Sequence, residues 1–158
     1  MYLRPHGRIV RRTTAVLVVE DDPSIRELIV TALKMEGYHG TGAGDTTAAL
    51  AQIRRHRPDL IITDYHLPGQ DGLELLRALR AEGFGDIPAL VISADVRPPD
   101  LPVTSFIPKP FDLDAILRAV RGALGKSGQS GSQQPSQLGT DGLRWASWLS
   151  PQTGLALA

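Results

Sequence analysis

Residues 15–35 read AVLVVEDDPSIRELIVTALKM. The segment Ala15–Val19 is aliphatic throughout, as expected for a strand that is covered on both faces of a parallel sheet. Three acids follow at positions 20–22, and Pro23–Met35 then carries apolar residues at helical spacing, with Gly37 just beyond its end. This part of the chain therefore predicts a buried strand, an acidic turn and an amphipathic helix.

The same alternation of strand and helix continues along the chain to residue 124. Further apolar runs predict strands at Tyr38–Thr41, Leu60–Thr63, Ala89–Ile92 and Ser105–Ile107. Apolar stripes of helical period predict helices at Thr46–Arg55, where Asp45 is the N-cap, Leu73–Ala81 and Leu113–Leu124. Strands that alternate with helices are joined by right-handed crossovers, so the predicted fold class is α/β with a parallel sheet.

Composition excludes several classes of protein. The 158 residues include 17 Lys and Arg, 17 Asp and Glu and no cysteine, which excludes disulfides, thiolate metal sites and cysteine nucleophiles. The longest apolar run, Ala15–Val19, is far shorter than the roughly 20 residues of a membrane helix, and no secretory signal is visible. We therefore expect a cytoplasmic protein without membrane insertion. Residues 15–125 hold 11 basic and 16 acidic side chains, which argues against a nucleic-acid surface there.

Both ends of the chain differ from this central block. Residues 1–13 form a basic leader with four arginines and no acid, which we expect to be disordered or an overlong start, although it could contact an acidic partner. Residues 126–158 form a flexible tail rich in Gly, Ser and Gln, with one short apolar island that contains Trp145 and Trp148. That island is either a docking motif or a segment without function.

Acidic side chains gather where predicted strands end. Glu20 and Asp21 follow the first strand, and Asp64 follows the third. Ligand sites in parallel α/β sheets lie at the carboxyl ends of the strands, so these carboxylates should meet. Crowded and partly desolvated carboxylates repel one another, and a hard divalent cation relieves that repulsion. We predict Mg²⁺ rather than zinc, because Mg²⁺ takes a few carboxylates, keeps several waters and accepts phosphate oxygens.

Two other strand ends supply groups that suit phosphoryl chemistry. Ser93 follows the fourth predicted strand and Lys109 follows the fifth. A carboxylate such as Asp64 can attack phosphorus and form an acyl phosphate. The transition state of that reaction is stabilised by a metal ion, an ammonium group and small hydrogen-bond donors. The four strand ends together therefore predict a phosphoryl site.

The motifs at these strand ends occur at Val18–Pro23, Asp64–Gly72, Ser93-Ala94 and Lys109–Phe111. In this order they resemble the receiver (CheY-like) domain of two-component response regulators, and the resemblance covers about residues 14–125. It implies a flavodoxin-like, doubly wound, five-stranded parallel sheet with strand order 2-1-3-4-5.

The resemblance also implies roles in the metal site. Asp64 matches the phosphoacceptor and would also contact Mg²⁺. Asp21 would bind the ion directly, whereas Glu20 would act mostly through water. His66 would offer its backbone carbonyl to the metal.

A second group of residues matches the switch of the family. Ser93 corresponds to the hydroxyl residue that hydrogen-bonds the phosphoryl group, and Lys109 to the lysine that pairs with it. The Lys109–Pro110 peptide bond is cis in relatives. Phe106 occupies the position of the aromatic residue that turns inward on activation.

The chain departs from the family pattern between Ser93 and Lys109. Only 15 residues separate these two positions, where family members usually place a loop, a helix and a strand. Pro98, Pro99 and Pro102 are incompatible with an ordinary helix interior. We therefore expect the fourth helix to be absent or one turn long, and the partner-binding face that relatives build from it to be altered.

These observations predict a single-domain response regulator rather than an ordinary enzyme. It would accept a phosphoryl group on Asp64 from a sensor histidine kinase or phosphotransfer protein, and would relay or signal through protein contacts. The residues after Gly125 are too few for a helix-turn-helix, so no DNA binding is expected. A receiver cut from a hybrid histidine kinase is the second possibility within this class.

Two other classes of function stay open. A small Mg²⁺-dependent phosphatase or phosphotransferase could use an Asp nucleophile, but haloacid-dehalogenase-like enzymes have a second Asp where His66 stands here. A receiver-like binding module that is never phosphorylated is the other.

Each candidate residue also has a purely structural explanation. His66 in an exposed turn is more often neither ligand nor acid–base group, and Asp71-Gly72 suits a turn followed by a helix start. The remaining structural explanations are helix capping for residues 20–22, a turn start for Asp64, a strand-end hydroxyl for Ser93, a solvated side chain for Lys109 and core packing for Phe106.

Overall fold

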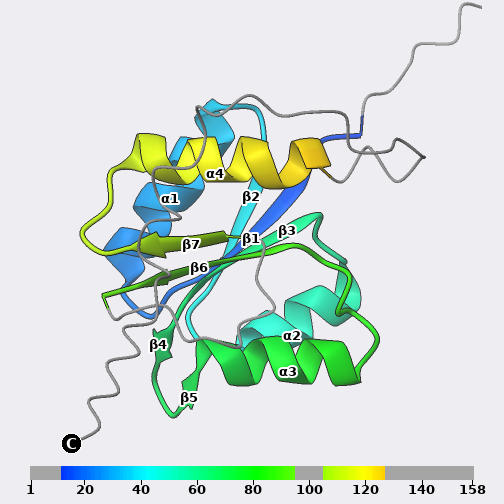
Figure 1. Cartoon of the computed structure of the whole chain (residues 1–158). Coiled ribbons are helices and arrows are strands. Elements are labelled where there is room, and N and C mark those ends of the chain that lie inside the picture. The colour runs from blue at the N-terminus through cyan, green and yellow to red at the C-terminus, as the bar shows by residue number, and fades with distance from the viewer. Residues whose placement is uncertain (1–11, 95–104, 127–158) are drawn as a thin grey trace, which may run out of the picture.

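A five-stranded parallel sheet forms the centre of the computed structural model, which describes residues 12–94 and 105–126 (Figure 1). Its strands are β1 (Ala15–Val19), β2 (His39–Ala43), β3 (Leu60–Asp64), β6 (Ala89–Ser93) and β7 (Ser105–Pro108). The helices in these residues are α1 (Pro23–Met35), α2 (Thr46–Arg55), α3 (Gly72–Ala81) and α4 (Leu113–Lys126). The sheet order β2-β1-β3-β6-β7 is the predicted order 2-1-3-4-5, so the predicted architecture is confirmed.

Helices cover both faces of the sheet, as Figure 1 shows: α1 and α4 lie on one face, and α2 and α3 on the other. Strand β1 lies in the interior of the sheet, between β2 and β3, and this position explains why its sequence is apolar without interruption. Val16 and Val18 face the cluster with α1 and α4, whereas Leu17 and Val19 face the cluster with α2 and α3. Because both faces of the sheet are covered by helices, β1 has no solvent-facing positions. It therefore lacks the alternation of apolar and polar residues that is typical of a sheet with one face in water.

In the acidic turn after β1, Asp22 has a different structural role from Glu20 and Asp21. The Asp22 carboxylate caps α1 by accepting hydrogen bonds from the backbone N–H groups of Ser24 (2.8 Å) and Ile25 (3.1 Å). At the other end of α1, Gly37 adopts a φ of 87°, a left-handed conformation that favours glycine. Helix capping therefore accounts for Asp22 but leaves Glu20 and Asp21 available for another role.

Element boundaries differ from the predicted ones by one or two residues. β2 spans His39–Ala43 instead of Tyr38–Thr41, and β3 and β6 include Asp64 and Ser93 as their last residues. The sequence pattern also missed a two-stranded hairpin of β4 (His66–Leu67) and β5 (Gln70–Asp71). This hairpin pairs only two residues on each side, which is too short to produce a hydrophobic period.

Several predictions concern residues that the structure leaves undescribed. The shortened or missing fourth helix would fall within residues 95–104, which lie outside the described ranges. The basic leader lies almost entirely outside them as well, and so does the tail with Trp145 and Trp148. Among the helices described, none has the length and apolar character needed to cross a bilayer.

Candidate functional site

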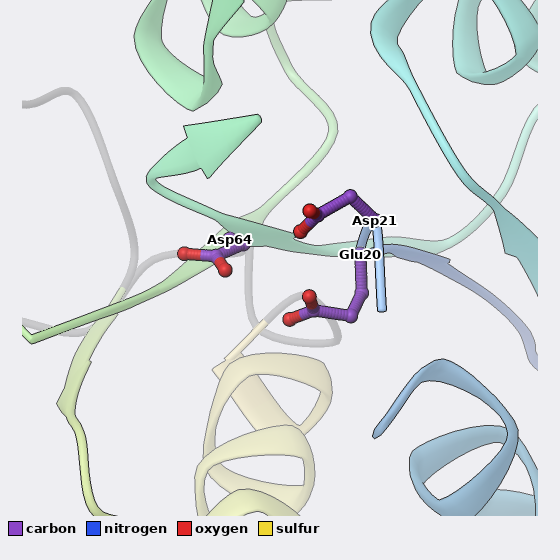
Figure 2. A group of neighbouring side chains, drawn as sticks. All are labelled: Glu20, Asp21 and Asp64. Atoms are coloured by element: carbon purple, nitrogen blue, oxygen red, sulfur yellow. The ribbon is translucent and has the colours of Figure 1, made fainter. Parts of the chain in front are cut away.

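Three carboxylates meet at the edge formed by the carboxyl ends of the strands, which we call the carboxyl edge. β1 and β3 are neighbours, with Val19 in register with Thr63, so the residues after them come to the same place. One carboxylate oxygen each from Glu20, Asp21 and Asp64 lies within 4.8 Å of the others. Figure 2 shows Glu20 and Asp21 directing their carboxylates toward the side on which Asp64 lies.

Glu20 is buried in this group, with a residue exposure of 3%. Its Oε1 accepts a hydrogen bond from the Asp22 N–H at 3.1 Å, whereas its Oε2 is buried without a hydrogen-bond partner among the described residues. Burial raises the pKa of Glu20 from 4.5 to about 7; the bond from Asp22 opposes the rise, and Asp21 and Asp64 add to it. The site therefore holds a carboxylate that a bound cation would stabilise in its ionised form.

Lys109, which directly follows β7, is a cation that faces these carboxylates. Its Nζ donates a hydrogen bond to Asp64 Oδ2 at 2.6 Å and lies 3.7 Å from Glu20 Oε2. Burial by itself would lower the pKa of Lys109, but the hydrogen bond to Asp64 and the nearby acids outweigh it and raise the pKa above the usual value. The ammonium group therefore stays charged and compensates part of the negative charge.

Asp64 is held at both of its oxygens. Oδ2 accepts from Lys109, and Oδ1 accepts from the backbone N–H of His66 at 3.1 Å. The His66 side chain is exposed and lies edge-on to the Tyr65 ring, with 4.8 Å between the ring centroids. The resemblance implied that His66 offers its backbone carbonyl to the metal, and this stays a prediction. The hydrogen bond from the His66 N–H to Asp64 was not predicted.

Ser93 and Lys109 are brought together by the pairing of β6 with β7. Ser93 is buried, follows Ile92, the register partner of Asp64, and its carbonyl accepts from the Lys109 N–H at 2.7 Å. The Lys109–Pro110 bond is cis, as the resemblance implied. Phe106 is half-buried on β7, and its switching role stays a prediction, as does the phosphoryl contact of Ser93.

Two residues that position Asp64 were missed at the sequence level. A Cβ at Gly72 would lie only 2.3 Å from the carbonyl oxygen of Asp64, so the start of α3 can approach β3 only with glycine there. The buried Thr63 hydroxyl donates to the same carbonyl at 2.9 Å. The expected turn and helix-start role of Asp71 is confirmed, because its side chain caps α3 through the Glu74 N–H at 2.8 Å.

The donor set of the site fits Mg²⁺. Its three candidate ligands are all carboxylate oxygens, which hard cations prefer. The buried Glu20 Oε2 lacks a hydrogen-bond partner, and such an atom is usually satisfied by an ion or a water. Glu20, Asp21 and Asp64 would therefore hold the cation, and Lys109 would lie beside it.

Comparison with known proteins identifies the class of this fold and site. Residues 16–121 match the sequence profile of the response regulator receiver domain. The chain belongs to this family, and its resemblance to receiver domains is thereby confirmed.

Several solved structures share the fold. The chemotaxis response regulator CheY4 of Vibrio cholerae is 28% identical with a TM-score of 0.67, and the match covers 72% of this chain and 100% of CheY4. The response regulator TrrA of Thermotoga maritima, solved in complex with Mg²⁺ and BeF, is 30% identical with a TM-score of 0.65, over 71% of this chain and 100% of TrrA.

Curated relatives include longer regulators. The phosphate regulon transcriptional regulatory protein PhoB of Pseudomonas aeruginosa is 33% identical over 131 residues, 78% of this chain and 57% of PhoB. The DNA-binding response regulator MtrA of Mycolicibacterium smegmatis is 35% identical over 69% of this chain and 50% of MtrA. The chain thus spans about half the length of the curated relatives that it matches.

Proposed function

We propose that this receiver domain accepts a phosphoryl group on Asp64 from a phosphohistidine of a sensor kinase or phosphotransfer protein. One carboxylate oxygen of Asp64 forms a bond to phosphorus as the phosphorus–nitrogen bond of the donor breaks. The electron pair stays on the imidazole nitrogen, which takes up a proton from water, and Asp64 carries an acyl phosphate. The donor chemistry follows from membership of the receiver family.

The observation that carries this proposal is the way in which Asp64 is held. Its carboxylate is buried, bonded to Lys109 and the His66 N–H, and placed beside two further carboxylates. The Lys109 ammonium and the His66 N–H would lie beside the arriving phosphoryl group, and such donors stabilise the negative charge that develops in the transfer. Mg²⁺, when bound by Glu20, Asp21 and Asp64, supplies the additional positive charge that this transfer requires.

Switching would follow from the charge that phosphorylation adds. A phosphoryl group brings about −1.5 to −2 charges at neutral pH. Lys109 would shift its hydrogen bond from the Asp64 carboxylate to the phosphoryl oxygens, and the Ser93 hydroxyl would donate to them. Because Ser93 is the last residue of β6 and Lys109 directly follows β7, this rearrangement would act on the face of the domain that those strands border, through which the receiver would contact its partner protein.

The direct test is phosphorylation by acetyl phosphate, which replaces the unidentified kinase. In the presence of Mg²⁺, intact-protein mass spectrometry should find one added phosphoryl group on the wild type and none on Asp64→Asn. Asp22→Asn is the matched control: it makes the same chemical change in the acidic turn next to Asp21, and Asn is an equally good helix cap. This control should be phosphorylated like the wild type.

Two results would contradict the proposal. Phosphorylation of Asp64→Asn to the same extent as the wild type would place the acceptor on another residue. Failure of the folded wild type to be phosphorylated at any Mg²⁺ concentration would favour a binding module that does not carry a phosphoryl group.

A further inference from the structure

Arg26 of α1 reaches back to the backbone of the acidic turn. Its Nη1 donates hydrogen bonds to the carbonyl oxygens of Glu20 at 2.6 Å and of Asp21 at 3.3 Å. The Arg26 backbone is itself fixed in the first turn of α1, because its N–H donates to the Asp22 carbonyl at 2.9 Å. One guanidinium therefore holds two successive peptide groups, the ones that carry two of the three site carboxylates.

The edge strand β2 provides the space through which this side chain passes. A Cβ at Gly42 would lie 2.9 Å from Arg26 Cδ and 3.0 Å from Cγ, and one at Gly44 would lie 3.4 Å from Nη1. The first distance is shorter than real Cβ contacts and the second is tighter than nine in ten of them, so a side chain at position 42 would displace Arg26. Between these glycines, the Ala43 carbonyl accepts from the Glu20 N–H at 3.1 Å. The glycines thus let Arg26 lie across β2 where β2 also holds the end of β1.

We infer that Arg26 is a positioning residue for the Mg²⁺ site, and that Gly42 is required for its action. Glu20 and Asp21 are adjacent in sequence, yet both must direct carboxylates toward Asp64 against their mutual repulsion. Hydrogen bonds from a charged donor to both carbonyls restrain the backbone in the orientation that achieves this. The inference rests on the proposed function for the identity of the ion.

The first experiment measures Mg²⁺ binding by isothermal titration calorimetry. Arg26→Met keeps most of the aliphatic stem but removes both hydrogen bonds, and should weaken Mg²⁺ binding about tenfold, as loss of such supporting contacts does at metal sites. Arg26→Lys, which keeps one charged donor, should fall between Arg26→Met and the wild type. The control is Arg55→Met, which removes the same charge at the last residue of α2, and it should bind Mg²⁺ like the wild type.

A double-mutant cycle separates positioning from a general loss of stability. Gly42→Ala should weaken Mg²⁺ binding when Arg26 is present, because the added methyl group displaces the Arg26 stem. In the Arg26→Ala background the same substitution should cause no further loss, since the clashing atoms are gone. Acetyl phosphate labelling of Arg26→Met should be slow at low Mg²⁺ and should recover at saturating Mg²⁺.

The outcomes distinguish this inference from the proposed function. If the wild type binds no Mg²⁺, the proposed function fails. If the wild type binds Mg²⁺ and Arg26→Met binds it within twofold, the positioning role is wrong while the proposed function stands. An equal loss in Arg55→Met, or additive losses in the cycle, would also overturn the positioning role. Should Arg26→Met not fold, Arg26→Lys and Gly42→Ala decide the question by the same titration.

Discussion

Charged side chains are paired differently at the carboxyl edge of the sheet and at the opposite edge, where the amino ends of the strands lie. At the carboxyl edge, Glu20 and Asp64 are almost completely buried, and among the described residues they pair with the same ammonium group, that of Lys109, while Asp21 lies beside them. At the opposite, amino edge, the ion pairs Arg54–Glu82 and Arg57–Asp86 are exposed and matched one to one. These pairs at the amino edge are therefore balanced locally, whereas the three carboxylates of the carboxyl edge have Lys109 as the cation that pairs with their side chains in the described part of the chain.

This difference indicates where the fold carries function. Exposed, matched ion pairs are screened by water and contribute little to stability or chemistry. Buried carboxylates in excess are unfavourable for folding by themselves, so their presence marks a site that a cation and a phosphoryl group would complete. Substitutions at the carboxyl edge should therefore change stability and Mg²⁺ binding, whereas substitutions at the amino edge should change neither.

The largest effect on stability is expected at Gly72. Gly72→Ala places a methyl group 2.3 Å from the Asp64 carbonyl, and the resulting displacement of α3 from β3 should lower the free energy of unfolding by about 3 kcal/mol. The matched control is Gly122→Ala in α4, where the added Cβ meets no atom within 4 Å, and it should be stabilising by about 0.5–1 kcal/mol. Urea unfolding followed by circular dichroism measures both; equal effects would mean that the close approach at Asp64 is not a constraint.

Removing the shared cation should have the next largest effect. Without Mg²⁺, Lys109→Ala should lower the free energy of unfolding by about 2 kcal/mol, because the buried carboxylates lose a charged hydrogen bond. The variant should still bind Mg²⁺ but lose the change in partner affinity that phosphorylation causes. Lys34→Ala, at an exposed position of α1, is the control, and a loss as large as that of Lys109→Ala would argue against the special role of the site.

The raised pKa of Glu20 predicts how the site responds to pH. Because the pKa of Glu20 is about 7 in the folded chain and has its ordinary value of 4.5 in the unfolded chain, the folded chain binds the proton more tightly. Without metal, this group makes stability fall as the pH rises from 4.5 to about 7. Mg²⁺ must displace the same proton, so its affinity should rise with pH, by up to about tenfold per pH unit below the pKa, and level off above it.

Calorimetric titration with Mg²⁺ at several pH values measures this dependence. Glu20→Gln has no proton to displace, so its remaining affinity should change much less over the same interval. An affinity for the wild type that is independent of pH would show that Glu20 is already ionised before the metal binds.

The smallest effects are expected at the amino edge. Glu82→Gln and Asp86→Asn each break an exposed ion pair with an arginine of α2 or of the segment after it. Both variants should keep the urea midpoint and the Mg²⁺ affinity of the wild type within experimental error. A loss of Mg²⁺ affinity in either variant would mean that the two edges are coupled and that the comparison between them is too simple.

Much of the fold was predictable because its signals are local. The uninterrupted apolar runs of β1 and β3 predicted buried parallel strands, and the acids that follow them predicted a site at the carboxyl edge. The convergence of Glu20, Asp21 and Asp64 follows from the topology rule that ligands collect at strand ends.

The contacts that support the site were not predictable in the same way. The clash that makes Gly72 necessary, the hydrogen bond from the His66 N–H and the path of Arg26 across Gly42 all depend on distances between segments that only folding brings together. The residues next to a glycine or an arginine in the sequence do not indicate which distant residue it will contact in the folded chain. For the same reason, the predicted bounds of β2 were wrong by one or two residues: its glycines allow the close approach of α1, but glycine has a low strand propensity.

Whether the carboxylates of the carboxyl edge form a Mg²⁺ site is measured by calorimetric titration of the folded chain with Mg²⁺, carried out on the wild type, Asp21→Asn, Asp64→Asn and Asp22→Asn. We expect one ion per chain for the wild type and for Asp22→Asn, and a severe loss of binding for Asp21→Asn and Asp64→Asn. Undiminished binding by the last two variants, or no binding by the wild type, would contradict this expectation.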